Sequence, residues 1–425
     1  MEFSQMNREQ LSALQASLRD QYESFKQANL NLDLTRGKPA AEQLDLSNAL
    51  DGILEGFYLL QDGTDVRNYG GILGIPEARQ LAAAFLEVDA SEVLVGGNSS
   101  LTLMFNYVDH MLPTWRKDLS EGGTERLKFI CPVPGYDRHF TICEHFGIEM
   151  LNVPLLDGGP DMDQVEALLR ADPLIKGIWC VPKYSNPTGH TYSDAVVDRF
   201  AKLADIAGAH FTILWDNAYT VHHLEDTHEQ LKNLMTTARQ QHTQDSVVIL
   251  GSTSKVTFAG AGVAFLATSP TNLKTFEKFL SASVIGYDKV NQLRHVRFLQ
   301  DSQHIAAHMV KHRNIIKPKF DLTQQILTQH LAGKGIATWT QPRGGYFVSL
   351  DTLPGLATEV IRQAAAIGVK LTPAGATFPY GVDPSNSNIR IAPTFPALGS
   401  LQRALEVFVV CLQLVTVNHF LSDQR

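Results

Sequence analysis

The chain has 425 residues, is 44% hydrophobic and 19% charged, and carries a formal net charge of -8. This composition is ordinary for a globular enzyme with one large domain and a second, smaller one. The acidic balance, without any run of Lys and Arg, argues against a nucleic-acid binder. We find no stretch approaching the roughly 18 apolar residues of a membrane span, and residues 1–20 lack the apolar core of a signal peptide. We therefore expect a cytoplasmic enzyme that binds neither nucleic acid nor a membrane.

The cysteines are widely spaced and form no CxxC pattern, which favours reduced, mostly buried thiols over disulfides. They are Cys131, Cys143, Cys180 and Cys411.

The chain begins with a helical pattern that includes Leu11, Leu14 and Leu18. Short apolar runs that end in turn residues then predict strands at 92–96, 128–131, 177–181, 211–215 and 246–251, with helices at 163–171 and 193–207 between them. This alternation predicts a mostly parallel sheet with crossover helices.

The last third of the chain has a different pattern. A helical stretch runs from 271 through 319, and strands near 336–340 and 345–350 precede a helix at 357–367. Short strands near Lys370 and Ile389 and a helix at 398–418 follow. We assign residues 1–55 to a segment that contributes to a small domain, residues 56–310 to a large domain, and residues 311–425 to the small C-terminal domain.

Ligands bind beyond the carboxyl ends of the strands in a parallel sheet, and the chemically informative residues follow predicted strands. In Gly251-Ser-Thr-Ser-Lys255, an apolar strand delivers a lysine into a turn of small residues. A single lysine is usually solvated. The alternative is a partly desolvated amine of lowered pKa that forms an imine with an aldehyde cofactor.

Two further turns offer partners for a cofactor ring. Asp216, at the end of another apolar strand, can cap a helix or pair with a pyridinium nitrogen. Tyr219 lies three residues on, and Asn186 belongs to the turn Asn186-Pro-Thr-Gly189. Both side chains can donate to a phenolic oxygen on the same ring.

Two motifs are suited to anions. In Gly96-Gly-Asn-Ser-Ser100, which opens a helix, Asn98 or Ser99 can cap the helix, or the free N–H groups can cradle a phosphate with Ser252 and Ser254. Arg390 lies inside an apolar strand and needs an anionic partner, which is either a structural carboxylate or the α-carboxylate of a substrate.

Taken together and in order, these motifs resemble the class I/II aminotransferases of fold type I, over almost the whole chain. The matching segments are Leu32-Asp-Leu-Thr-Arg-Gly-Lys-Pro39, Asn68-Tyr-Gly-Gly-Ile-Leu-Gly-Ile-Pro-Glu-Ala-Arg79, Pro132-Val-Pro-Gly-Tyr-Asp-Arg-His139, Asn186-Pro-Thr-Gly189, Asp216-Asn-Ala-Tyr219, Ser252-Thr-Ser-Lys255, Pro342-Arg-Gly-Gly-Tyr-Phe-Val348, Leu371-Thr-Pro-Ala-Gly-Ala-Thr-Phe378 and Asn388-Ile-Arg390.

The resemblance implies a large domain with a mostly parallel seven-stranded sheet, a smaller α/β domain, and pyridoxal 5'-phosphate as cofactor. It implies that Lys255 holds the cofactor as a Schiff base, that Asp216 pairs with the ring nitrogen, and that Tyr136 stacks on the ring. It also implies that Asn186 and Tyr219 bond the ring oxygen, and that the phosphate is held by Asn98, Ser99, Ser100, Ser252 and Ser254. Arg390 and the backbone near Gly37 are expected to bind the substrate carboxylate. Tyr69 is expected to reach the phosphate of the neighbouring subunit of a homodimer.

One departure concerns the phosphate site. In the family, an arginine usually follows the lysine by about eight residues, whereas this chain reads Lys255-Val-Thr-Phe-Ala-Gly-Ala-Gly-Val-Ala-Phe265. The segments Thr35-Arg-Gly-Lys-Pro39 and Trp215-Asp-Asn-Ala-Tyr-Thr-Val-His-His223 resemble a divergent bacterial group described as aspartate aminotransferases.

The implied function is a ping-pong transamination, through a ketimine, between aspartate or glutamate and 2-oxoglutarate or oxaloacetate. Other uses of the same cofactor are transamination of aromatic or other amino acids, cleavage of carbon–sulfur bonds by a β-lyase, and decarboxylation. A regulatory module that has inherited the fold is disfavoured, because the family motifs begin near Leu32 and leave no room for a preceding DNA-binding domain.

A dicarboxylic substrate requires a second cation, and the sequence alone does not choose one. The group from Lys289 to Arg294, at the start of a predicted long helix, is placed to reach a partner subunit, and Arg343 beside the Gly-Gly turn is another good candidate. The candidates are Arg36, Lys38, Arg138, Lys183, Lys289, Arg294 and Arg343. His304, His308 and His312 have the helical spacing of metal ligands. They lie among Lys311 and Arg313 without an acidic ligand, so we predict a solvated helix face and no metal site. His222 and His223, close to Tyr219, are expected to pack against the site at least as readily as to catalyse.

Overall fold

The apolar runs predicted as strands lie side by side in one large sheet of the computed structural model, which describes residues 1–120 and 124–423. In spatial order its strands are β2 (Val93–Val95), β9 (Ala264–Thr268), β8 (Val247–Ser252), β7 (Thr212–Asp216), β6 (Ile175–Cys180), β3 (Lys128–Val133), β4 (Glu149–Leu156) and β5 (Gly159–Pro160). The central pairs β4–β3–β6–β7–β8 are parallel, and the pairs of β9 and β5 are antiparallel. The mostly parallel sheet is confirmed. The described residues form eight strands instead of seven, because Gly159–Pro160 adds a two-residue edge strand.

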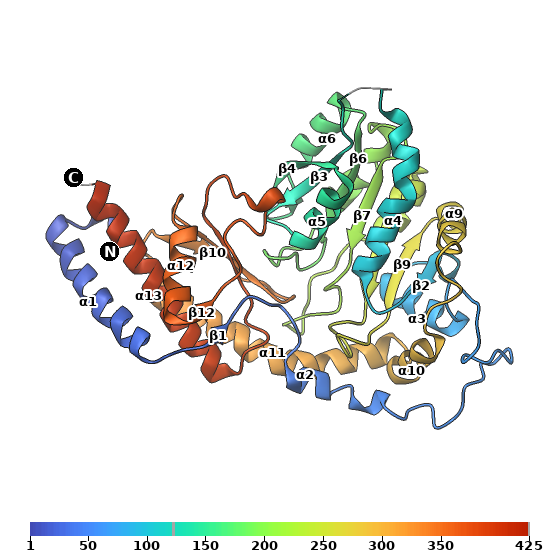
Figure 1. Cartoon of the computed structure of the whole chain (residues 1–425), viewed down its shortest axis with the longest axis horizontal. Helices are drawn as coiled ribbons and strands as arrows, with labels where there is room; N and C mark the ends of the chain where they lie inside the picture. Colours follow the sequence, from blue (N-terminus) through green and yellow to red (C-terminus); the bar gives the residue numbers. More distant parts are fainter. Residues whose placement is uncertain (121–123, 424–425) are drawn as a thin grey trace.

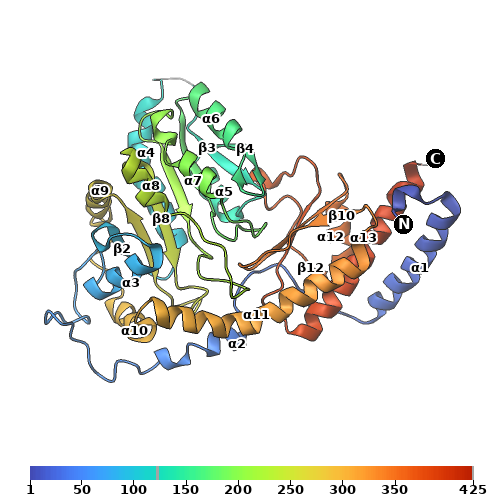
Figure 2. The same cartoon turned by 180° about the vertical axis from the view of Figure 1, so that it is seen from behind.

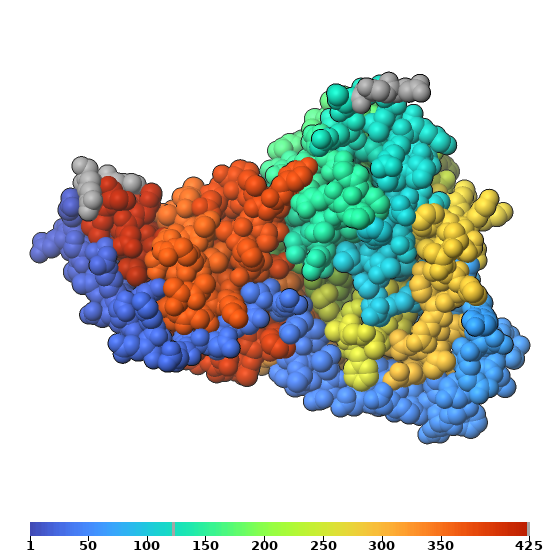
Figure 3. All heavy atoms as spheres, in the orientation of Figure 1, coloured from blue at the N-terminus to red at the C-terminus, as the bar shows by residue number. Residues whose placement is uncertain are grey.

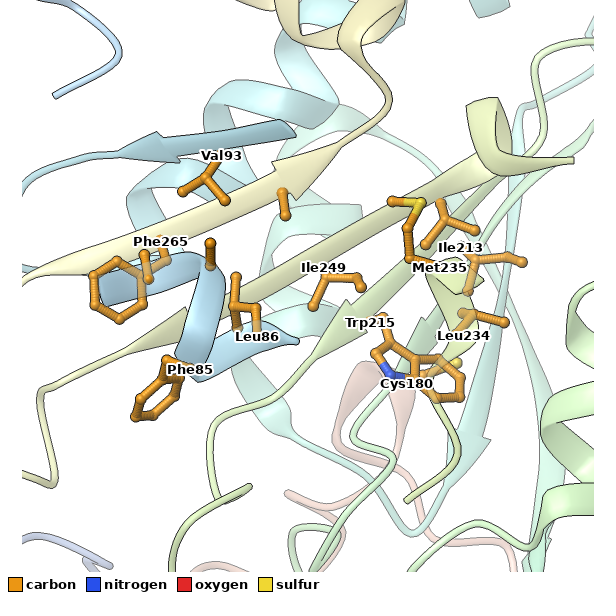
Figure 4. Packing of buried hydrophobic residues seen from close by; sticks show 14 of the residues in the cluster. Phe85, Leu86, Val93, Cys180, Ile213, Trp215, Leu234, Met235, Ile249 and Phe265 are labelled. Atoms are coloured by element: carbon orange, nitrogen blue, oxygen red, sulfur yellow. The ribbon is translucent and has the colours of Figure 1, made fainter. Parts of the chain in front are cut away.

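Helices cover both faces of this sheet, and for that reason its central strands are apolar throughout. Figure 4 shows one covered face, where Phe85 and Leu86 of α3 lie toward Phe265 and Ile249, and Met235 of α8 lies near Ile213. The opposite face packs against α4, α5 and α9. Because both faces of the sheet are covered by apolar side chains, its carboxyl edge is the place where polar side chains can face a ligand.

The helices of the larger lobe are α3 (Pro76–Leu86), α4 (Ser100–Trp115), α5 (Asp137–Phe146), α6 (Met162–Ala171), α7 (Asp194–Phe200), α8 (Leu234–Gln241), α9 (Pro270–Leu280) and α10 (Lys289–Leu299). The stretch predicted as helical from 271 to 319 is helical, and it is divided among three helices, α9, α10 and α11 (Ser302–Leu331). The side chains of Asp288 and Asp301 accept backbone N–H groups and so start α10 and α11 as separate helices.

The smaller lobe contains α1 (Arg8–Gln27), α12 (Ala357–Ile367) and α13 (Leu398–Asp423), which pack around short strands (Figure 1). Its strands are β10 (Ala337–Trp339), β11 (Val348–Thr352) and β13 (Asn388–Ile391) in an antiparallel sheet, and β1 (Leu32–Asp33) with β12 (Val369–Lys370) in a parallel pair. Both ends of the chain lie at the far end of this lobe (Figure 2).

The helix α13 corrects one expectation. By length and composition it is apolar enough to cross a membrane, although we expected no such stretch. Most of it is buried against α1, α11 and α12, so it is the core helix of the smaller lobe.

The N-terminal segment joins the two lobes along one face of the molecule (Figure 3). It leaves β1, forms the short helix α2 (Ala41–Asp45), and continues to α3. The long helix α11 also runs from one lobe to the other (Figure 2). Because α11 crosses residue 310 without a break, the proposed boundary there stays a prediction, as does the one at residue 55.

Candidate active site

Polar residues from three neighbouring parallel strands meet at the carboxyl edge of the large sheet. Asp216 is the last residue of β7, Lys255 lies in the turn after β8, and Asn186 follows β6. Since β6, β7 and β8 are adjacent and parallel, their carboxyl ends lie together. These side chains are therefore presented on the same side of the sheet.

Asp216 is 2% exposed, and one of its two carboxylate oxygens has a partner. The Oδ2 atom lies 3.2 Å from Nε2 of His139, and the His139 ring stacks on Trp179 with centroids 4.4 Å apart. The Oδ1 atom is buried and has no hydrogen-bond partner among the described residues. A buried, half-satisfied carboxylate is costly unless a ligand donates to it.

The Lys255 amine lies close to these groups. Its Nζ is 4.8 Å from the centre of the Tyr219 ring. Burial lowers the pKa of Lys255, and the Asp216 carboxylate acts in the opposite direction. An amine with a lowered pKa is more often neutral, and a neutral amine is the form that attacks an aldehyde.

Two tyrosines enclose the site. Burial is the main cause that raises the pKa of Tyr136 to about 12 and the pKa of Tyr219 well above its usual value, and the charge of Asp216 contributes to both. Both hydroxyls are therefore protonated at neutral pH and available as hydrogen-bond donors.

A turn and a helix start lie together where the sequence predicts an anion cradle. Ser99 is the N-cap of α4, but its side chain makes no capping hydrogen bond, so the N–H groups of the first turn keep no such partner. Asn98 donates to the carbonyl of Gly260 at 2.9 Å, and the Ser254 hydroxyl donates to the carbonyl of Asn98 at 3.2 Å. Ser252 Oγ accepts the Ser254 N–H at 3.4 Å. The structure thus brings all the predicted phosphate residues of this chain except Tyr69 to one place.

Where the family usually has an arginine, this chain has Val263, whose side chain is buried. Its N–H donates to the Thr253 hydroxyl at 2.9 Å. This position therefore offers no cation to a phosphate.

Arg390 lies on β13, is 9% exposed, and faces the site from the smaller lobe. Its Nη1 donates to Asn186 Oδ1 at 3.3 Å and lies 3.5 Å from Asp137 Oδ1, while its Nη2 donates to Thr372 Oγ1 at 3.4 Å. Its Nε is buried without a partner among the described residues. These contacts are long for an arginine ion pair, so the guanidinium keeps capacity for a further carboxylate.

Gly37 is held beside Arg390 through an aromatic ring. The Phe347 ring lies 4.9 Å from the Arg390 guanidinium carbon, and a Cβ added to Gly37 would come within 2.3 Å of that ring. The close approach of the backbone at residue 37 therefore requires glycine.

Tyr69 is exposed at the surface of the single chain. Its side chain is 86% exposed, on the segment before α3. The backbone beside it is supported by Lys289, whose Nζ donates to the Gly70 carbonyl at 2.6 Å.

The candidate cations for a second carboxylate separate into two groups. Four are held elsewhere or buried: Lys289 by Gly70, Arg294 by Leu50 and Asp51, Arg343 by Thr227, and Lys183, whose pKa is lowered by burial. The exposed Arg36, Lys38 and Arg138 lie next to Gly37 or Tyr136 in the chain. These three are the exposed candidates whose neighbours in the sequence belong to the site, and Lys38 Nζ lies 4.0 Å from the centre of the Phe395 ring.

The solvated helix face predicted for the histidines of α11 is wrong for two of them. His308 and His312 are 7% and 1% exposed, and both lie against the backbone after Lys255. Lys311 and Arg313 belong to a different face of the same helix, so their charges did not indicate whether the histidines are exposed. His304 is exposed and contacts Asp301.

Sequence reasoning missed His139 and Phe347, although both lie in matched motifs. His139 follows Tyr136, the N-cap of α5, by three residues, and the two rings meet edge to face with centroids 5.0 Å apart. His222 lies beside the turn of Lys255, since its Nε2 is 3.3 Å from the Lys255 carbonyl oxygen.

Comparison with known proteins identifies close relatives of the whole chain. The sequence matches the family described as aspartate amino-transferase over residues 6–424. An aspartate aminotransferase of Corynebacterium glutamicum is 41% identical over 424 residues, covering 97% of this chain and 96% of that protein. The crystal structure of an aspartate transaminase from Corynebacterium glutamicum has a TM-score of 0.94 and 40% identity, covering 99% of both chains. An α-aminoadipate aminotransferase from Thermus thermophilus, complexed with N-(5'-phosphopyridoxyl)-L-leucine, has a TM-score of 0.73 at 21% identity, covering 93% of this chain and 94% of that one, a likeness of fold alone.

Proposed function

This chain belongs to the aspartate aminotransferase family and is an aminotransferase, and we propose that it uses pyridoxal 5'-phosphate to exchange the amino group of aspartate or glutamate with 2-oxoglutarate or oxaloacetate. The observation that carries the proposal is the buried Asp216 Oδ1, which has no hydrogen-bond partner in the described part of the chain and lies next to the turn of Lys255. A protonated ring nitrogen is the donor that this oxygen requires.

The residues of this chain fit the cofactor at three further places. The uncapped start of α4, with Asn98, Ser99 and Ser100, is suited to a phosphate, because helix N-termini attract anions. Lys255 offers an amine of lowered pKa to an aldehyde. Tyr136 offers a ring that can lie against the face of the cofactor.

Bound pyridoxal phosphate supplies an electron-withdrawing ring that stabilises negative charge at the substrate Cα. Asp216 keeps the ring nitrogen protonated, and His139 orients the Asp216 carboxylate through Oδ2. Lys255 would hold the cofactor through its amine, and as a neutral amine it would move the proton at the substrate Cα.

Asn186 and Tyr219 donate to the phenolic oxygen of the ring. Because the Asn186 Oδ1 already accepts from Arg390, its amide nitrogen is the atom left to donate. The raised pKa of Tyr219 keeps its hydroxyl proton available. Both bonds favour one orientation of the ring.

Arg390 binds the α-carboxylate of the substrate with its fork of N–H donors, and the backbone near Gly37 contacts the same group. Arg36, Lys38 or Arg138 binds the distal carboxylate of a dicarboxylic substrate. Support for this assignment comes from the exposure of these three cations beside Gly37 and Tyr136.

The enzyme works as a homodimer with shared active sites, in which Tyr69 reaches the phosphate bound to the partner. The 86% exposure of Tyr69, and the exposure of Phe57 and Leu59 on the same protruding segment (Figure 1), support this arrangement. A cytoplasmic location is supported by the four cysteines, all of them buried and free of disulfides.

The test is a donor screen with 2-oxoglutarate, read together with the absorption spectrum of the protein mixed with pyridoxal phosphate. We expect turnover with aspartate and glutamate, and a visible band that Lys255→Ala abolishes together with turnover. Activity confined to aromatic or branched donors overturns the substrate assignment. Near-normal transamination by Lys255→Ala overturns the role of the lysine.

A further inference from the structure

The backbone that carries Lys255 is held by two buried histidines of a different element. The carbonyl oxygen of Val256, the residue after Lys255, lies 2.7 Å from Nε2 of His308 and 2.9 Å from Nε2 of His312. Both histidines project from α11 and are almost completely buried. A carbonyl oxygen has two lone pairs, so it can accept from both imidazoles.

Gln43 determines the tautomer of His312. The Gln43 Oε1 accepts the N–H of Ala40 at 3.1 Å, so its amide nitrogen is the atom that faces Nδ1 of His312 at 3.2 Å and the hydroxyl of Tyr346 at 2.9 Å. An amide nitrogen only donates, hence the Nδ1 of His312 accepts. The imidazole proton is therefore on Nε2, where it donates to the Val256 carbonyl.

Both imidazoles are neutral at physiological pH. Burial, followed by the neighbouring His308, lowers the pKa of His312 to about 4, and burial also lowers the pKa of His308. Two neutral rings can approach closely, and their Nε2 atoms lie 3.1 Å apart. A charged pair at this distance would repel.

The same network ties the N-terminal segment to the long helix. Gln43 lies on α2, a few residues after Gly37, and α2 has a second link to α11 because Lys319 Nζ lies 3.0 Å from the Glu42 carboxylate. Lys319 also donates to the Thr394 carbonyl at 2.8 Å. Hydrogen bonds thus connect the segment that contacts the substrate carboxylate, through α11, with the turn of the lysine.

We propose that His312, oriented by Gln43 and assisted by His308, is a positioning residue that places Lys255 through the Val256 carbonyl and couples that placement to the segment 37–43. The proposal rests on the proposed role of Lys255 as the lysine that links the cofactor. A network of stability alone would affect unfolding and leave the reactivity of the lysine unchanged.

The test compares His312→Leu, which removes the donor, with His312→Gln, whose amide nitrogen can replace Nε2. We expect His312→Leu to lower kcat by about tenfold to a hundredfold, the loss that follows from misplacing a reacting group by about 1 Å, with KM nearly unchanged. The rate at which the apoprotein develops the visible band with pyridoxal phosphate, measured without any amino acid, falls in parallel. His312→Gln restores most of both rates.

A control separates positioning from loss of stability. Ile326→Ala removes a buried side chain of the same helix, in the core of the smaller lobe. It should lower the thermal unfolding temperature and leave kcat and the rate of band formation at the values of the unmodified enzyme.

Gln43→Leu provides a second route that leaves the imidazole in place. It removes the donor to Nδ1, so the His312 proton is no longer restricted to Nε2. We expect kcat and the rate of band formation to fall, but by less than in His312→Leu. The double variant Gln43→Leu/His312→Leu should be no slower than His312→Leu, because the two residues act through one contact. If His312→Leu does not fold, the positioning role is tested by comparing kcat and the rate of band formation of Gln43→Leu with those of Ile326→Ala.

The outcomes separate a failure of the proposed function from a failure of the positioning role alone. If Lys255→Ala keeps the visible band, the proposed function fails and this inference fails with it. If Lys255→Ala loses the band while the foldable variants of the Gln43–His312 pair retain normal kcat and normal band formation, only the positioning role is overturned.

Discussion

Replacing Gly37 by alanine should weaken substrate binding through the Phe347 ring. The added Cβ would lie 2.3 Å from Cζ and 2.5 Å from Cε1 of Phe347. Carbon atoms in contact are about 3.5 Å apart, so the ring or the backbone must move by about 1.2 Å. The ring packs against the Arg390 guanidinium, and its displacement therefore moves the group that binds the carboxylate.

Overpacking of this kind costs about 1 to 3 kcal/mol of folding stability. Only the part of this strain that acts on the bound state changes affinity, so about 150-fold is the upper limit of the expected loss. We expect the loss in the KM of the amino donor, since the carboxylate contact is made in the ground state and the transition state alike. The assay measures kcat and KM for aspartate, together with the visible band of the bound cofactor, which should not change.

Two variants complete this experiment. Gly399→Ala is the matched control, because no described atom outside its own helix backbone and chain neighbours lies within 4 Å of the added Cβ, and its backbone is not in the left-handed region. Phe347→Leu shortens the obstructing side chain, so the double variant Gly37→Ala/Phe347→Leu should bind aspartate better than Gly37→Ala alone. A KM for Gly37→Ala equal to that of the unmodified enzyme would refute the reasoning.

Three other changes have defined outcomes. Asp216→Asn should lower kcat by about a hundredfold to a thousandfold, the range for loss of a preorganised electrostatic partner, while the visible band shows that the cofactor is still bound; an unchanged kcat would contradict its role. Arg390→Lys keeps the charge but loses the fork, so the KM of amino donors should rise about tenfold or more without loss of the cofactor. Burial lowers the pKa of His222 to about 3 and of His312 to about 4, from 6.5. The unfolded chain therefore binds more protons below pH 6.5, and the free energy of unfolding should fall as the pH drops, by about 2 kcal/mol for each histidine at about pH 5. Urea denaturation at neutral and acid pH measures this slope, which should be shallower in His312→Leu.

Local sequence was sufficient to predict the strands of the large sheet and the turns that follow them. Apolar runs ending in small or polar residues predicted β7 with Asp216 and β8 with the turn of Lys255, because both features depend on neighbours in the chain. The exact breaks between helices were less accessible, since they depend on single capping residues such as Asp288 and Asp301.

The burial of His308 and His312 could not be read from their neighbours. Periodicity places residues on helix faces, but it does not say which face another element covers. The face that carries both histidines packs against the lysine turn, whereas Lys311 on the same helix is exposed.

The sequence by itself determined the class of the protein, the order of its strands along the chain and the residues at their carboxyl ends, because these follow from short-range pattern and from motifs in a fixed order. Only the tertiary structure decided which of these residues have partners: His139 for Asp216, Phe347 beneath Gly37 and Arg390, and the histidines of α11 behind Lys255. Each of these contacts joins residues far apart in the chain. Such contacts depend on how helices and sheets pack in three dimensions, and that packing leaves no local signal in the amino-acid pattern.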